Sequence, residues 1–287
     1  MLELKAYAKV NLTLEVLGKR DDGYHDIVSI MQTVGLSDTV TLEEADGTTL
    51  DCDVPELSGP DNLALKAAQL IAHETGGGKG VAIGLQKGIP VTAGLGGGSS
   101  DAAAVLRGLN RLWKLGLSVH ELQALGAKLG SDVPFFIQGG TAMAQGRGEA
   151  IRPMPKADVN WMVVLTPNID VSAKTASLYG KLGRNDFTKG MLTRKLEARI
   201  RGGGDVPAQF LFNTFDAIAF GAFPGLEKCW KTFESVGARE VHLAGSGPSM
   251  FALVSQREVG SAMALLLTHS YGWKASLVEA VWPSEDV

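Results

Sequence analysis

The sequence predicts a protein of the α+β class, and three kinds of pattern carry that prediction. Apolar and polar residues alternate strictly from Leu2 to Val16, which is typical of a strand with one buried face. Apolar residues recur at helical spacing in residues 62–73, 101–113 and 118–129. Short apolar segments at 81–85 and 161–165 predict further strands. Helices and strands are therefore mixed along the chain, although periodicity alone does not give their order in space.

Composition limits the function classes. Of the 287 residues 45% are apolar, which is enough for a buried core, and the formal net charge of −4 offers no basic field for nucleic acid or anionic lipid. An anionic ligand must therefore be held locally, by backbone amides and a few cations. The two cysteines, Cys52 and Cys229, lie far apart and favour a reducing compartment. Without a signal peptide or a membrane-spanning run, the sequence predicts a cytoplasmic protein.

The first strand carries candidate functional residues. Lys9, Asn11 and Thr13 have the same parity, so we expect them to share one face of the strand. Residues 18–23 then predict a turn, which is followed by Tyr24 and His25. Lys9, Tyr24 and His25 each have an alternative explanation without a function. A strand lysine usually extends into solvent, Tyr24 could be a packed aromatic, and His25 could be a surface histidine.

A glycine-rich segment precedes the helix expected from residue 101. Four of the five residues from Gly94 to Gly98 are glycine, and Ser99, Ser100 or Asp101 is the expected N-cap. Glycines let a ligand approach the main chain, and a helix start offers N–H groups to an anion. A flexible linker is the alternative, but linkers rarely lead directly into an apolar helix. No lysine follows the glycines, and Ser99 stands where a dinucleotide fingerprint needs glycine, so neither of those motifs fits.

Asp132 is the second candidate. It lies in the segment Gly130–Phe136, between two helical patterns, with Pro134 at an expected first helical position. Taken alone, the aspartate is more simply explained as a helix cap. The preceding helix begins at Ser118 with Glu121 at capping-box spacing, and Gly130 is expected to end it.

The second half begins after a polar, proline-containing segment at residues 152–160. This composition predicts a boundary between domains at 1–152 and 153–287. A glycine turn at 244–247 separates the apolar segments 241–243 and 250–254, and residues 201–205 predict an exposed loop.

Together these segments resemble the GHMP kinase superfamily. The resemblance spans nearly the whole chain and rests on five motifs, at residues 8–12, 20–25, 90–103, 130–136 and 243–249. The motif at 20–25 resembles a subfamily that phosphorylates the 2-hydroxyl of 4-diphosphocytidyl-2-C-methyl-D-erythritol in the non-mevalonate isoprenoid pathway, rather than the mevalonate or homoserine kinases.

The resemblance implies a fold, a reaction and a site. The implied fold has an N-terminal ribosomal S5 domain 2-like domain and a C-terminal ferredoxin-like domain, with the active site between them. The implied cofactors are ATP and Mg²⁺, and the implied partner is a small-molecule substrate. The implied catalytic residues are Lys9 and Asp132, with Ser99 or Ser100 suggested near a phosphate-bound magnesium and no metal ligand assigned. The implied nucleotide-binding residues are Pro90, Val91, Thr92, Ala93, Gly94, Leu95, Gly96, Gly97, Gly98, Ser99 and Ser100. The implied substrate-binding residues are Asn11, Tyr24, His25, Tyr179, Gly245 and Ser246.

Two alternatives to this function are a superfamily kinase with another acceptor, such as mevalonate or homoserine, and a nucleotide-binding paralogue without turnover. The motif at 20–25 disfavours the first, and the presence of both Lys9 and Asp132 disfavours the second. The chain also departs from the family pattern at Thr214 and Asp216, where Asp and Glu are more usual, and at Ala173, where Thr is common.

Overall fold

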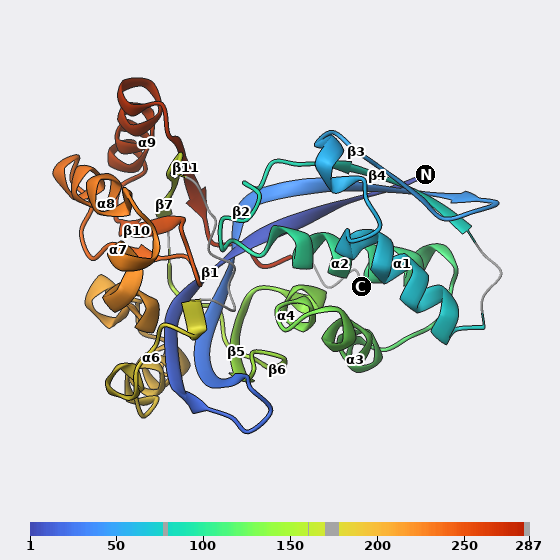
Figure 1. Ribbon diagram of the computed structural model, residues 1–287, viewed down its shortest axis with the longest axis horizontal. Helices are drawn as coiled ribbons and strands as arrows, with labels where there is room; N and C mark the ends of the chain where they lie inside the picture. Colours follow the sequence, from blue (N-terminus) through green and yellow to red (C-terminus); the bar gives the residue numbers. More distant parts are fainter. Residues whose placement is uncertain (77–79, 160, 170–177, 284–287) are drawn as a thin grey trace.

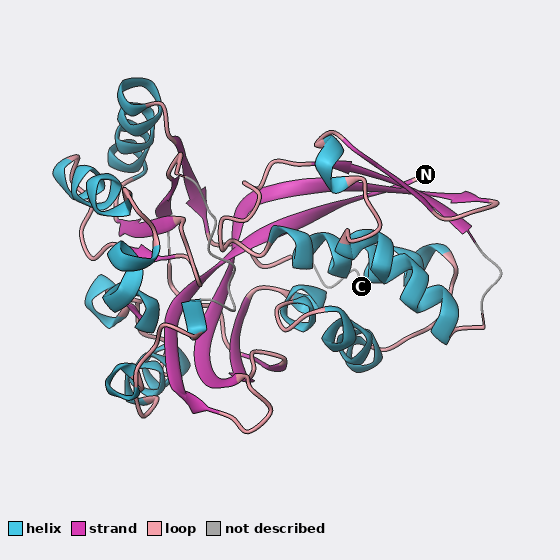
Figure 2. Ribbon diagram, viewed as in Figure 1, coloured by secondary structure: helices cyan, strands magenta, loops and turns pink. Residues whose placement is uncertain are grey.

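The computed structural model describes residues 1–76, 80–159, 161–169 and 178–283, and it confirms the α+β prediction. Within these residues the strands form one sheet of seven strands and one of four, with helices packed against both (Figures 1 and 2). None of the described helices is both long and apolar enough to cross a membrane. Cys52 and Cys229 are buried and unpaired.

The larger sheet is built on two long antiparallel strands that run across much of the molecule in Figure 1, β1 (Leu2–Lys19) and β2 (His25–Ala45). They are joined by the predicted turn, in which the amide of Arg20 donates to the carbonyl of Tyr24. One half of β2 pairs with β4 and the other half with β5, so the sheet has the order β3-β4-β2-β1-β8, with β5 and β6 added beside β2. The remaining strands are β3 (Thr49–Cys52), β4 (Gly80–Gln86), β5 (Thr141–Gly146), β6 (Ala150–Pro153) and β8 (Phe212–Asn213).

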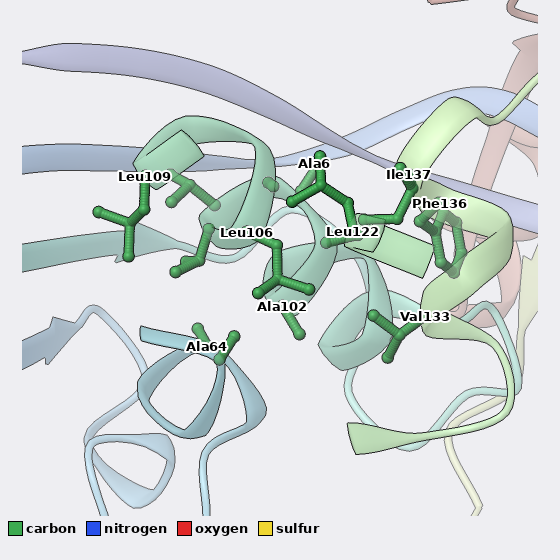
Figure 3. Close-up of a cluster of buried hydrophobic side chains, with 14 of the residues drawn as sticks. Ala6, Ala64, Ala102, Leu106, Leu109, Leu122, Val133, Phe136 and Ile137 are labelled. Carbon is green, nitrogen blue, oxygen red and sulfur yellow. The ribbon is translucent and has the colours of Figure 1, made fainter. Parts of the chain in front are cut away.

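Four helices cover one face of this sheet: α1 (Leu63–Glu74), α2 (Gly97–Leu112), α3 (Val119–Leu129) and α4 (Val133–Gln138). Helix α2 is central, with Leu106 and Leu109 between the sheet and α1 in the core drawn in Figure 3. The capping box expected at Ser118 and Glu121 is present at the start of α3. This packed layer fixes the start of α2, and with it the glycine-rich loop.

The smaller sheet has the order β11-β7-β10-β9, and its strands are antiparallel. Helices α8 and α9 pack on one face, and Met162, Val164 and Phe251 on the other face share a core with Val10 and Leu12 of β1. Two further helices, α6 and α7, belong to this half, and α6 lies against β1 and β2. The bounds are β7 (Trp161–Thr166), β9 (His242–Leu243), β10 (Met250–Val254), β11 (Lys274–Glu279), α6 (Met191–Arg201), α7 (Ala219–Ala222), α8 (Leu226–Ser235) and α9 (Arg257–Tyr271).

The second half of the chain also contributes to the larger sheet. Strand β8 pairs in parallel with β1 at Thr13 and Leu14, so the two halves share a sheet as well as a core. The division at residue 152 stays a prediction. The loop expected at 201–205 follows α6 and is largely exposed.

The central part of β1 differs from the sequence prediction, because it is buried on both faces. Every residue from Ala8 to Val16 is buried, including Lys9, Asn11, Thr13 and Glu15. The expectation of a half-buried strand is wrong here, since the second half of the chain covers the polar face. The Glu15 carboxylate, for example, accepts a hydrogen bond from the amide of Thr193 in the first turn of α6 (2.7 Å). Polar residues on this covered face need partners, and those partners form part of the site.

Candidate active site

The glycine-rich loop joins the end of β4 to α2, and Gly96 is the N-cap of the helix. Gly96 has a left-handed φ of 76° and precedes the first helical residue, Gly97. A side chain at Gly96 would also collide with Phe136, because an added Cβ would lie 2.7 Å from that ring. The predicted cap at Ser99, Ser100 or Asp101 is therefore wrong, since the helix begins earlier and these residues lie inside it. The first turn, whose N–H groups have no partner within the helix, consists of Gly97, Gly98 and Ser99.

The residues predicted to bind the nucleotide fall into three groups. Gly94, Gly96 and Ser99 line a cleft of about 830 Å³. Ala93, Leu95 and Ser100 are buried and do not line the cleft. Ser99 is therefore the serine whose hydroxyl can reach a ligand there. The remaining residues belong to the same loop and first turn without lining the cleft: Pro90, Val91, Thr92, Gly97 and Gly98.

Lys9 and Asp132 both line this cleft, as the sequence predicts. The Lys9 Nζ lies 3.7 Å from the Asp132 Oδ2, and the side chain of Asp132 is 37% exposed whereas that of Lys9 is 5% exposed. Asp132 is at the N-cap position of α4, yet its carboxylate makes no capping hydrogen bond. The simpler explanation as a cap is therefore wrong. Pro134 is the second residue of α4, one position later than expected.

Two contacts orient the ammonium of Lys9. Its Nζ donates to the Asn11 Oδ1 (2.7 Å), and the Asn11 amide donates in turn to the Ser29 hydroxyl (2.7 Å). The backbone amide of Lys9 donates to the carbonyl of Leu95 (3.0 Å), which joins β1 to the glycine-rich loop. The alternative of a solvent-exposed strand lysine is therefore wrong, and Asn11 lies beside the pair formed by Lys9 and Asp132.

The other end of the cleft is aromatic. The His25 ring packs against Tyr179 (5.1 Å between centroids) and Phe187 (5.9 Å), and Tyr179 meets Phe215 edge-on (4.8 Å). Tyr24 is 53% exposed while His25 is buried, so the alternative of a packed tyrosine and a surface histidine is wrong.

The environment of the His25 ring and of the Tyr179 phenol keeps both groups neutral. Burial, followed by the charge of Lys19, lowers the pKa of His25 below its usual value, so the ring is neutral at pH 7. Burial, followed by the charge of Asp132, raises the pKa of the Tyr179 phenol. A neutral imidazole can donate from one nitrogen and accept at the other, which suits recognition of a polar ring edge.

Several residues of the cleft were not predicted. Lys19, Asp22 and Arg147 line it, and the Arg147 guanidinium lies 4.8 Å from the centre of the Tyr24 ring. Arg147 follows a strand that pairs with β2 near His25, a neighbourhood with no local sequence signal. The other unpredicted lining residues are Leu14, Gly23, Ile27, Ser131, Gly180 and Phe215.

A second unpredicted cluster lies behind the glycine-rich loop. The Lys87 ammonium is paired with both Asp38 and Asp101, and all three side chains are almost fully buried. Asp38 also accepts from the amides of Gly88 (2.7 Å) and Ile89 (2.8 Å), immediately before the loop. Burial, opposed by the charge of Lys87 and helped by that of Asp38, raises the pKa of Asp101 to about 7. The cluster ties the two ends of the loop together.

The glycine turn of the second half closes the cleft, with Gly245 and Ser246 among its lining residues. Two of the three departures from the family pattern have hydrogen-bond partners in the structure. The Thr214 hydroxyl bonds to the backbone of Val16 and Leu14 in β1. Asp216 accepts from the amide of Leu243 and pairs with the His242 ring (2.7 Å). The third departure, Ala173, lies outside the described residues.

In the described part of the chain, no group of three or more His, Cys, Asp or Glu side chains could hold a metal ion. The oxygen donors that line the cleft near the loop include the Asp132 carboxylate and the hydroxyls of Ser99, Ser131 and Ser246. One carboxylate and a few hydroxyls fit a Mg²⁺ ion that arrives bound to phosphates, since such an ion takes few protein ligands.

Comparisons with known proteins show the family of this chain. The family model of the GHMP kinases N terminal domain matches residues 62–140. A 4-diphosphocytidyl-2-C-methyl-D-erythritol kinase of Dehalococcoides mccartyi is 42% identical over 284 residues, which is 99% of each chain.

Solved structures agree as well. A crystal structure of 4-(cytidine 5'-diphospho)-2C-methyl-D-erythritol kinase has a TM-score of 0.82 at 33% identity and covers 98% of this chain and 100% of its own. A homoserine kinase of Cytophaga hutchinsonii shares the fold at 17% identity, with a TM-score of 0.73 and coverage of 98% and 94%. This chain belongs to the GHMP kinase superfamily and, within it, to the 4-diphosphocytidyl-2-C-methyl-D-erythritol kinase family.

Proposed function

We propose that this enzyme transfers the γ-phosphoryl group of ATP to the 2-hydroxyl of 4-diphosphocytidyl-2-C-methyl-D-erythritol, giving the 2-phosphate and ADP. The observation that carries the proposal is a single cleft that holds three parts one after another in space. These are a helix N-terminus, a lysine–aspartate pair and an aromatic pocket. These three parts suit a triphosphate, a reacting hydroxyl and a nucleobase. The reaction places the enzyme in the non-mevalonate route to isoprenoids.

Asp132 is proposed to accept the proton of the acceptor hydroxyl. Its partly exposed carboxylate has no capping role, so it is free to approach a hydroxyl at about 3 Å. Lys9 is proposed to orient that carboxylate and to stabilise the charge that develops on the transferred phosphoryl oxygens. Asn11 keeps the Lys9 ammonium on the cleft side of the strand. Phosphoryl transfer asks a protein mainly for such positioning and charge stabilisation.

The loop from Gly94 to Ser99 is proposed to hold the β- and γ-phosphates with backbone N–H groups at the start of α2. Mg²⁺ bound to ATP would neutralise phosphate charge, with Ser99 and Asp132 as the protein groups within reach. With a net charge of −4, the protein relies on these local groups to attract an anionic nucleotide.

The aromatic end is proposed to bind the cytidine part of the substrate. His25 would bond to the edge of the cytosine, and Tyr24 and Tyr179 would pack against it. Arg147, beside Tyr24, and Lys19 supply the positive charge that a diphosphate linkage needs. Gly245 and Ser246 would complete the wall beside the acceptor.

Two alternatives are weaker. A mevalonate or homoserine kinase has no use for a base-sized aromatic pocket beyond the reactive pair. A paralogue without turnover would not need a buried lysine held against an uncapped aspartate. A cytoplasmic location and a division into domains at residue 152 remain part of the proposal.

The test is ADP release from purified protein with Mg²⁺, ATP and one acceptor at a time. We expect turnover with the diphosphocytidyl compound and at least about 100-fold lower kcat/KM with mevalonate or homoserine, because those acceptors leave the cytidine pocket empty. Equal efficiency with all three acceptors would refute the substrate assignment. ATP binding without turnover on any acceptor would instead support the non-catalytic paralogue.

A further inference from the structure

One buried side chain, Asn213, holds the glycine turn that closes the cleft. The Asn213 amide group donates to the carbonyls of both Leu243 (3.0 Å) and Gly245 (2.7 Å), and its Oδ1 accepts from the amide of Phe215 (3.0 Å). The side chain is 2% exposed, so all of these bonds are made away from water. A buried amide with two carbonyl acceptors fixes the position of the backbone that carries them.

The turn that Asn213 holds lies directly on the reactive pair. Gly245 has a φ of 75°, and an added Cβ there would lie 2.6 Å from the Lys9 Nζ and 3.2 Å from the Asn11 Oδ1. The backbone of the turn is therefore the wall against which the Lys9 ammonium rests. A shift of this wall by a fraction of an ångström changes the space available to that ammonium.

The same turn also contacts the glycine-rich loop. The amide of Ser249 donates to the carbonyl of Ala93 (3.1 Å), and the amide of Ala244 donates to the carbonyl of Ser249 (2.7 Å). The turn thus lies between the start of the phosphate-binding segment and the lysine. Asn213 is the side chain that ties it to β8, and β8 in turn pairs with β1.

We propose that Asn213 is a positioning residue for phosphoryl transfer, which acts by holding the carbonyl of Gly245 so that the turn keeps the Lys9 ammonium aligned with Asp132. This inference rests on the proposed roles of Lys9 and Asp132. In this proposal Asn213 does not touch the substrate. It affects the transfer step, in which charge moves onto the phosphoryl group, through the position of Lys9.

The most informative variant is Asn213→Asp. It keeps an oxygen for the amide of Phe215, and so leaves Phe215 and the neighbouring Tyr179 in place, but it replaces the amide donor. A carboxylate there would face two carbonyl oxygens, whereas the protonated acid could still donate to one of them. We therefore expect kcat to fall about 10-fold at pH 8, and to recover partly as the pH is lowered to 6. The KM for the acceptor should stay within about twofold, since its aromatic pocket is untouched.

The matched control is Thr214→Val, the neighbouring buried residue. It also loses two backbone hydrogen bonds, but these join β1 and not the glycine turn. We expect a comparable loss of thermal stability with kcat within about twofold of wild type. The titratable groups around the turn (Lys9, Asp132, Asp216 and His242) are the same in all three proteins, so the ratio of variant to wild-type kcat removes their contribution.

Three results would overturn the inference. The first is a kcat for Asn213→Asp equal to that of Thr214→Val. The second is a ratio of the Asn213→Asp kcat to the wild-type kcat that does not change between pH 6 and 9. If Asn213→Asp does not fold, Gly245→Ala tests the same turn from its other side, and we expect at least a 10-fold loss of kcat because its Cβ would meet the Lys9 Nζ. The third result that would overturn the inference is an unchanged kcat in Gly245→Ala. Turnover is measured with whichever acceptor the wild type phosphorylates, so a wrong substrate assignment does not affect this test.

Discussion

Two clusters of lysine and aspartate lie beside consecutive glycines of the glycine-rich loop. Lys9 passes close to Gly96 and pairs loosely, at 3.7 Å, with an aspartate that is 37% exposed. Asp38 lies close to Gly97, and in that cluster Lys87 pairs with two aspartates whose side chains are 0% and 3% exposed. The same residue types therefore have two different roles. The open pair keeps a carboxylate that can reach a ligand, whereas the closed cluster has no opening to the cleft and fastens the loop.

The largest effect expected from this comparison is on stability, in the closed cluster. Lys87→Met leaves two buried carboxylates without their cation, so we expect the free energy of unfolding to fall by about 3–5 kcal/mol in urea denaturation. Lys66→Met is the matched control, because it removes an ion pair to the exposed Asp61, and it should change stability little. Equal effects of the two variants would mean that the closed cluster does not fasten the loop.

The next effect is on turnover, in the open pair. Asp132→Asn keeps the shape of the side chain but removes the base, so kcat should fall about 100-fold or more. Stability should change little, since Asp132 makes no capping bond and pairs with Lys9 only at 3.7 Å. ATP affinity should also change little, because the backbone amides of the loop are proposed to hold the phosphates. Steady-state kinetics check the expected kcat, a nucleotide-binding titration checks the ATP affinity, and urea denaturation checks the stability. Near-normal turnover would remove Asp132 from its proposed role.

A smaller effect is expected at the aromatic end of the cleft. His25→Ala should raise the KM for the diphosphocytidyl acceptor about 10-fold and leave the KM for ATP unchanged, because the ring faces the cytidine end. Because burial and then the charge of Lys19 lower the pKa of His25, the wild-type ring stays neutral from pH 7 to 9, and the acceptor KM should be constant over that range. His120→Ala, at an exposed position, serves as the control. An unchanged acceptor KM in His25→Ala would argue against base recognition by this residue.

The smallest effect is the pH dependence of stability at Asp101. Between the usual aspartate pKa of 3.8 and about 7, the unfolded chain has lost this proton and the folded protein keeps it, so wild-type stability falls as pH rises through that window. Asp101→Asn lacks this titration. Its stability relative to wild type should therefore increase between pH 5 and pH 8, by at least about 1 kcal/mol, since one pKa unit is worth about 1.4 kcal/mol. The exposed Asp51→Asn is the control, and an equal pH trend in both variants would contradict the assignment.

The open and closed clusters also differ in how far the sequence predicts them. The proposed phosphate-binding loop is visible locally, because glycines before a helix are themselves the expected binding element. Strand alternation gives the face on which Lys9 lies, but only the family resemblance implies its catalytic role. The predicted start of α2 is wrong because Gly96 caps the helix in a left-handed conformation, at a position where the Phe136 ring leaves no room for a side chain. The contact of His25 with Tyr179, and the cluster of Asp38, Lys87 and Asp101, join distant segments with no shared local pattern. The burial of both faces of β1 depends on the second half of the chain in the same way.

A crystal structure with a non-hydrolysable ATP analogue, Mg²⁺ and the diphosphocytidyl acceptor tests the account most directly. We expect the β- and γ-phosphates on the backbone amides between Gly94 and Ser99, and the acceptor hydroxyl about 3 Å from the Asp132 carboxylate with Lys9 beside it. A triphosphate bound elsewhere, or a γ-phosphate on the side of the loop away from Lys9 and Asp132, would contradict it.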